Sequence, residues 1–243
     1  MRTKTACALL IGIFLAASNA SAQGFWAKKP WQKWSAEDCK KMLTDSPWAQ
    51  TWTNTQIVNT PIGQRSNATG RNEDPILYYF VQLRSSLPVR QAVGRSAQIE
   101  NKYDKATDAQ KKAIDDSVNG YLARNYDDDI VVHMDYNSNV EVYERDLRHY
   151  WQAFAPGVVP ENTYLINSRG QKIVPRAMEV ATGAQTAVEF IFPRRVNGQI
   201  LIQPGDKSFS FQFDSPAIDT LPAQTAFVEF KTNKMMFDGQ LSS

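Results

Sequence analysis

Cysteine is nearly absent from this sequence. The chain of 243 residues contains only Cys7 and Cys39, and Cys7 lies in an N-terminal segment that we expect to be removed during export. Cys39 would then have no partner in its own chain, which excludes an internal disulfide. We expect a buried free thiol at Cys39, as is usual for unpaired cysteine, and a disulfide to another chain stays open.

The chain also lacks an apolar run of the roughly 20 residues that span a bilayer. Its most apolar stretch, residues 6–17, follows the positive charges of Arg2 and Lys4 and precedes the small residues at 20–22. This three-part arrangement is typical of a secretory signal peptide. We therefore predict that residues 1–22 are a signal peptide and that the mature protein is exported, periplasmic or secreted, with no transmembrane segment.

An excess of either charge is missing as well. The full chain has 27 basic and 25 acidic residues, and removal of residues 1–22 takes away two of the basic ones. The mature chain is therefore formally neutral. Because nucleic-acid binding depends on a basic surface, we predict no nucleic-acid partner.

Recognised catalytic and metal-binding motifs are absent from the sequence. The chain has only two histidines, His133 and His149. They form no HExxH or comparable metal pattern, and we expect both to be structural. No G-x-S-x-G elbow and no glycine-rich phosphate loop is present. These absences favour a non-catalytic protein without a cofactor.

Tryptophan, in contrast, is concentrated near the start of the mature chain. Five of the six tryptophans lie within residues 24–52, next to several lysines: Trp26, Trp31, Trp34, Trp48 and Trp52. Such rings could contact a membrane surface, stack on a glycan or dock a partner protein. Alternatively, they fill a groove on the body of the protein, because large apolar rings gain from burial. A short helix is expected between the N-cap Ser35 and Pro47.

The middle of the chain predicts a strand followed by two helices. Residues 76–83 (ILYYFVQL) are aromatic and β-branched, as in a central strand. N-cap residues at Ser86 and Thr107 begin two amphipathic segments, which we expect to pair as a helical hairpin over residues 86–124. From residue 129 onward, short alternating segments separated by turn residues predict an antiparallel β-sandwich.

We therefore predict an α+β protein. A C-terminal, immunoglobulin-like antiparallel β-sandwich over residues 129–243 would carry the inserted helical hairpin. Residues 76–243 would form one composite domain, because the hairpin falls between two strands. A Trp-rich N-terminal segment with one short helix, residues 23–75, would precede it.

Two charged clusters are candidate binding sites. Three consecutive acids, Asp127, Asp128 and Asp129, lie near Asp135 and offer the oxygen ligands that calcium prefers, although the EF-hand spacing is missing. The alternative is a solvated turn. Two adjacent arginines, in Phe192-Pro193-Arg194-Arg195, could bind an acidic ligand. The alternative is a solvated strand end that discourages pairing with another sheet edge.

Three segments carry a resemblance to a known group of proteins. They are WSAEDCKKMLTDSPW (34–48), YFVQLRSSLPVRQA (79–92) and FVEFKTNKMMFDGQ (227–240). Together they resemble uncharacterised exported bacterial proteins. The resemblance implies export but brings no catalytic or binding residue with it.

The sequence as a whole predicts a non-catalytic binding or assembly module of the bacterial cell envelope. We expect an envelope protein or a glycan as its partner, and peripheral contact with a membrane stays open. The alternative is an envelope hydrolase whose acidic residues cannot be identified from their spacing, because a chain with 25 acids always contains pairs of them.

Overall fold

A computed structural model describes residues 24–55 and 74–243. The predicted signal peptide and most of the polar stretch after residue 55 lie outside the described residues. The described chain combines helix and strand, with antiparallel sheets and four α-helices, which confirms the mixed class predicted from the sequence. No helix within this described part has the length and apolar character of a membrane span.

The larger sheet has five strands in the order β1-β2-β3-β7-β6, and all its pairings are antiparallel. The strands are β1 (Ala49–Thr55), β2 (Ile76–Leu83), β3 (Asp129–Ser138), β7 (Ala187–Pro193) and β6 (Ala177–Val180). Alternate residues of β2, β3 and β7 are fully buried, as the two-residue period of a strand requires when one face packs on a core. The sequence did not predict β1, because AQTWTNT is mostly polar and only a few of its side chains face inward.

The smaller sheet has the order β11-β10-β4-β5. Its strands are β11 (Gln224–Lys231), β10 (Ser208–Ser215), β4 (Tyr164–Ile166) and β5 (Lys172–Ile173). The alternation in KSFSFQF places Phe209, Phe211 and Phe213 on one buried face of β10. Two small hairpins complete the β-structure: β8 (Arg195–Val196) with β9 (Gln199–Ile200), and β12 (Met236–Phe237) with β13 (Gln240–Leu241).

Aromatic side chains join the two sheets face to face. The ring of Phe211 lies 5.3 Å from that of Phe190 and 6.1 Å from that of Phe192. The ring centres of Phe213, on the smaller sheet, and Tyr79, on the larger sheet, lie 5.1 Å apart. The antiparallel layers predicted from the sequence are therefore present, but an immunoglobulin-like sandwich is not confirmed.

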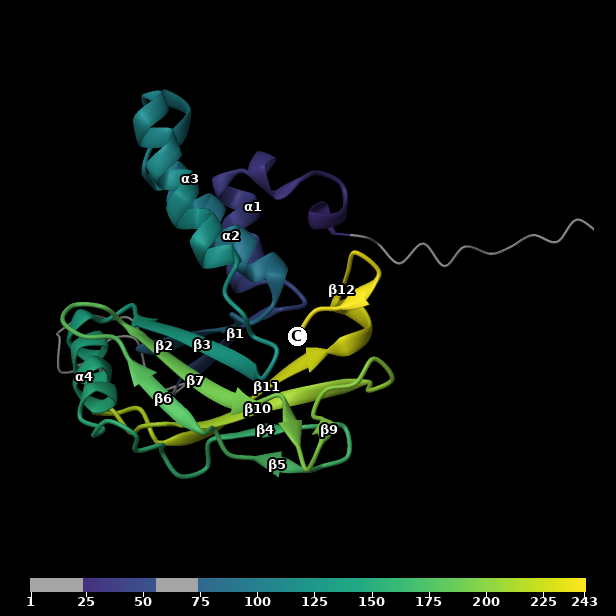
Figure 1. Ribbon diagram of the computed structural model, residues 1–243. Coiled ribbons are helices and arrows are strands. Elements are labelled where there is room, and N and C mark those ends of the chain that lie inside the picture. The colour runs from purple at the N-terminus through teal and green to yellow at the C-terminus, as the bar shows by residue number, and fades with distance from the viewer. Residues whose placement is uncertain (1–23, 56–73) are drawn as a thin grey trace, which may run out of the picture.

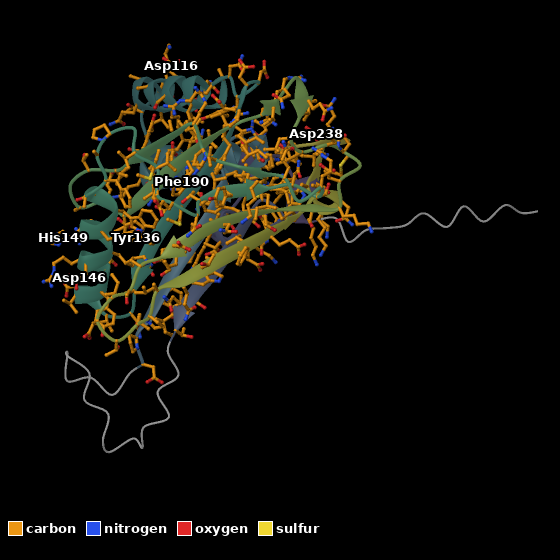
Figure 2. All side chains as sticks on the ribbon, turned by 90° about the horizontal axis from the view of Figure 1, so that it is seen from below. Asp116, Tyr136, Asp146, His149, Phe190 and Asp238 are labelled. Atoms are coloured by element: carbon orange, nitrogen blue, oxygen red, sulfur yellow. The ribbon has the colours of Figure 1, made fainter. Side chains whose placement is uncertain are left out.

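Helix α4 (Glu141–Gln152) packs beside the sheets and covers one end of this core (Figure 1). Its Trp151 is fully buried and lies 6.5 Å from Tyr136 and 6.1 Å from Phe190, ring centre to ring centre. Figure 2 shows Tyr136 and Phe190 inside the body, whereas Asp146 and His149 lie at its outer edge on α4. His149 is exposed.

The other three helices gather over the opposite part of the larger sheet (Figure 1). They are α1 (Ala36–Thr44), α2 (Leu87–Glu100) and α3 (Asp108–Leu122), and short 3-10 turns are η1 (Phe25–Ala27), η2 (Trp31–Lys33), η4 (Tyr103–Lys105) and η5 (Thr232–Lys234). Of the three predicted N-caps, Ser35 and Thr107 form complete capping boxes, whereas Ser86 precedes α2 without a side-chain capping hydrogen bond. Along the chain, the α2–α3 hairpin is inserted between β2 and β3, as predicted. A Cβ at Gly94 would come 2.8 Å from Val118, so glycine is needed for this close helix packing.

Phe211→Ala should destabilise the protein strongly, because it removes a ring that lies between the two sheets and leaves a cavity. The expected loss in the free energy of unfolding is about 3–5 kcal/mol, measured by urea denaturation. Phe227→Ala is the matched control: this ring, on β11, is 59% exposed, and its loss should cost about 0.5 kcal/mol or less. Equal small losses for both variants would contradict the described core.

Candidate anion-binding site

The structure places the predicted tryptophan site mostly against the core. Trp34 and Trp48 are 1% and 0% exposed, so neither ring presents a face to a ligand. The Nε1 of Trp48 donates to the backbone oxygen of Ser242 at 2.7 Å. Trp26, Trp31 and Trp52 are half-buried against the same core. A ligand role for these three rings stays a prediction.

The four carboxylates predicted as a calcium site do not come together. Asp129 forms an ion pair with Arg176, whose Nε lies 2.8 Å from Oδ1. Asp135 is six residues further along β3, which places it about 20 Å away at the rise of a strand. Asp127 and Asp128 are exposed in the preceding loop. Among the residues that the structure describes, no group of three or more His, Cys, Asp or Glu side chains could hold a metal ion.

The single predicted thiol is buried. Cys39 lies on α1 with 1% of its surface exposed, and burial raises the pKa of this thiol, although Ser96 and Arg95 act in the opposite direction. A thiol of raised pKa is a poor nucleophile at neutral pH. The expectation of a buried free cysteine is confirmed.

A hollow with a strongly charged lining lies between the start of α2, the α3–β3 loop and the end of β7. Its volume is about 740 Å³. Its charged lining consists of Arg90, Arg124, Arg194, Arg195 and Asp127. Four guanidinium groups against one carboxylate leave a formal charge of +3. We call this pocket the arginine hollow.

Arg194 anchors the wall of the arginine hollow. Its Nε donates to the backbone oxygen of Tyr126 at 3.0 Å, and its Nη2 donates to the backbone oxygen of Asp129 at 2.9 Å. The same guanidinium bonds to the hydroxyl and the backbone oxygen of Ser243, at 3.0 and 2.7 Å. Burial lowers the pKa of Arg194, while Asp127 and Asp129 partly counteract this effect. Most N–H groups of Arg194 thus bond to the protein itself. Its role in the hollow is therefore to fix the surrounding backbone and to contribute positive charge.

Arg90 reaches the arginine hollow from α2. Its Nη1 donates to the backbone oxygens of Leu122 and Arg124 at the end of α3, and its guanidinium carbon lies 5.0 Å from the centre of the Tyr126 ring. Its Nε is buried and has no hydrogen-bond partner among the described residues. Burial lowers the pKa of Arg90 as well. The Nε is shielded from the hollow, so the donor that Arg90 can offer a ligand is its Nη2, which makes no hydrogen bond to the described residues.

Arg124 and Arg195 are the exposed members of the set. The guanidinium of Arg124 lies 5.1 Å from the ring centre of Tyr121, and Arg195 begins the β8–β9 hairpin. Within the described part of the chain, neither guanidinium has a hydrogen-bond or ion-pair partner. Both guanidinium groups can therefore turn toward a ligand.

The sequence identified half of the arginine hollow. Arg194 and Arg195 were already candidates for an acidic ligand because they are adjacent. Arg90 and Arg124 were missed, because an arginine on an amphipathic helix or just after it is indistinguishable from a solvated surface residue. A small signal was present in Asn125, Tyr126 and Asp127, a polar loop that directly follows a helix and precedes a central strand.

A second polar cluster lies on the outer face of the larger sheet. The Nδ1 of His133 is 3.0 Å from Glu189, and its Nε2 is 3.0 Å from Asp135. The hydrogen bond from His133 lowers the pKa of Glu189, against the opposing effect of burial. Neither carboxylate lines the arginine hollow. His133 is 8% exposed and is satisfied by this network, which agrees with its expected structural role.

Comparison of the chain with protein-family models, with curated proteins and with solved structures finds no match. The function therefore has to be inferred from the geometry of the chain itself.

Glu189→Gln should reveal a stabilising contribution that depends on pH. Because the folded pKa of Glu189 is lowered, its carboxylate stabilises the fold above the unfolded pKa, about 4.3, and this contribution is lost as the pH falls through the lower folded value. We expect the stability gap between the parent and the variant to be widest above about pH 5 and to close toward pH 3. Urea denaturation at several pH values measures it.

The matched control for this pH series is Glu229→Gln on β11. Glu229 is exposed and bonds to no side chain that the structure describes. The difference in stability between the parent and Glu229→Gln should therefore vary far less with pH. A Glu189→Gln gap that stays constant from pH 3 to pH 7 would show that the His133–Glu189 bond does not act through charge.

Proposed function

We propose that this protein is a non-catalytic binding module whose ligand is an anion held in the arginine hollow. The observation that carries the proposal is the convergence of four guanidinium groups on one hollow that contains a single carboxylate. Arginine offers a planar fork of donors that matches carboxylate and phosphate oxygens. A cluster of this composition therefore suits an acidic ligand.

Burial supports the same proposal through its energetic cost. Arg90 and Arg194 are removed from much of the solvent, and burial is the main cause of the lowered pKa of each. A charge with incomplete compensation is costly to bury. A bound anion would offset that cost and would form charge-assisted hydrogen bonds, each about 1.5–3 kcal/mol.

The aromatic side chains near the hollow favour recognition by charge over recognition by stacking. Guanidinium groups already cover a face of Tyr126 and of Tyr121. A base or a sugar ring that binds by stacking needs a free aromatic face.

The cellular setting of this proposal comes from the sequence. The signal-peptide pattern of residues 1–22 supports a binding or assembly module of the bacterial cell envelope, periplasmic or secreted. An anionic envelope protein, glycan or membrane surface would be a partner of suitable charge. The alternative of an envelope hydrolase would have to use carboxylates such as Asp135 and Glu189. Both of these bond to the same imidazole ring.

Arg124→Ala and Arg195→Ala should each weaken anion binding. We expect inorganic phosphate to bind the purified mature protein, and each variant to reduce its affinity by about tenfold or more, because a charge-assisted hydrogen bond is lost. Isothermal titration calorimetry at pH 7 and low salt measures this. The affinity of the unmodified protein should fall as salt is added.

Matched controls come from α4. Arg145 is exposed and bonds only to the adjacent Asp146, so Arg145→Ala should leave phosphate affinity unchanged. Asp127→Asn should tighten binding, because it removes the one carboxylate of the hollow, and Asp146→Asn should not. Failure of phosphate to bind, or equal affinities across all these variants, would contradict the proposal.

A further inference from the structure

A second hollow adjoins the arginine hollow. Its volume is about 610 Å³, and it lies along the β8–β9 hairpin. Its lining includes Arg169, Arg195, Gln199 and Gln203, together with Ile200 and Pro204. Arg195 lines both hollows. The two hollows therefore share one exposed arginine.

The second hollow is also positive. Its lining contains two arginines and no carboxylate. Arg169 is fixed there, since its Nη2 donates to the backbone oxygen of Leu201 at 3.2 Å and its Nη1 lies 3.4 Å from Asp206. Asp206 in turn accepts a hydrogen bond from the backbone N–H of Gln203 at 2.8 Å, which holds the floor of this hollow in place. Asp206 therefore offsets the charge of Arg169, and Arg195 is the arginine of this lining that has no carboxylate partner among the described residues.

The density of arginines distinguishes phosphate from carboxylate. One carboxylate is satisfied by one or two guanidinium forks, whereas a phosphate group offers more acceptor oxygens and, in a chain, repeats its charge at close intervals. Arg90, Arg124 and Arg195 retain unused donors around the arginine hollow. That supply exceeds what a single carboxylate can accept.

We infer that the ligand carries two or more linked phosphate groups and passes from the arginine hollow across Arg195 into the second hollow. This inference rests on the proposed anion-binding function and names its ligand class. One phosphate would lie among Arg90, Arg124 and Arg195, and the next along the chain would lie over Gln199. Free oligophosphate and a lipid headgroup with two phosphates joined through glycerol, as in cardiolipin, share this chemistry.

The test compares inorganic phosphate with long-chain inorganic polyphosphate on the same protein by calorimetry. We expect polyphosphate to bind at least about tenfold more tightly, because a second anionic group adds contacts of the same kind. Gln199→Glu places a negative charge in the second hollow only. It should weaken polyphosphate binding about three- to tenfold and weaken the binding of inorganic phosphate less, because the two hollows share only Arg195.

The control variant is Gln185→Glu, which adds the same charge at an exposed position before β7, at the far end of that strand from Arg194. It should change neither affinity. A thermal melt of each variant confirms that the fold is intact. Co-sedimentation with cardiolipin vesicles, compared with phosphatidylcholine vesicles, then separates a lipid source of the phosphates from free polyphosphate.

The outcomes separate the inference from the proposed function. If phosphate binds through Arg124 but polyphosphate binds no more tightly and Gln199→Glu has no effect, the anion site stands and the extended ligand is overturned. If poly-glutamate binds as tightly as polyphosphate, the phosphate class is overturned. If no anion binds, the proposed function fails as well.

Discussion

The half-buried guanidinium of Arg194 makes the hydrogen bonds on which the shape of the candidate site depends. From the end of β7 it bonds to the backbone of the loop before β3 and to Ser243. A lysine could not replace it, because an ammonium group lacks the planar fork that reaches several carbonyl oxygens at once. The backbone oxygens of Tyr126 and Asp129 satisfy two of its hydrogen bonds, while the carboxylates of Asp127 and Asp129 partly offset its charge.

The position of Arg194 relies in turn on the packing of the two sheets. Phe190, Phe192 and Phe211 pack together between β7 and β10. Arg194 and Arg195 directly follow the last residue of β7, so this packing fixes the backbone that leads into them. On the other side of the hollow, the close contact at Gly94 fixes α3 against α2, so the end of α3 holds Arg124 near Arg90. The site is thus assembled from elements that the core already orders, with the exposed arginines as its adaptable part.

Local signals in the sequence predicted much of this fold. The N-cap Ser35, the capping box at Thr107, the apolar strand 76–83 and the alternating phenylalanines of β10 each depend on neighbouring residues, and each was predicted. Strand β1 was missed because its pairing with β2 depends on distant contacts. The calcium prediction grouped acids that are neighbours in sequence, yet a strand separates Asp129 from Asp135 in space. Arg90 and Arg124 were missed for the converse reason, because only the tertiary fold brings them to Arg194.

The central claim is that the arginine hollow binds an anion through free guanidinium groups. Arginine-selective ¹⁵N NMR of the Nε–H groups, recorded while pyrophosphate is added, tests it most directly. The account predicts saturable shifts for Arg90, Arg124 and Arg195, with Arg145 on α4 unchanged. Uniform small shifts across all arginines, or none at all, would contradict it.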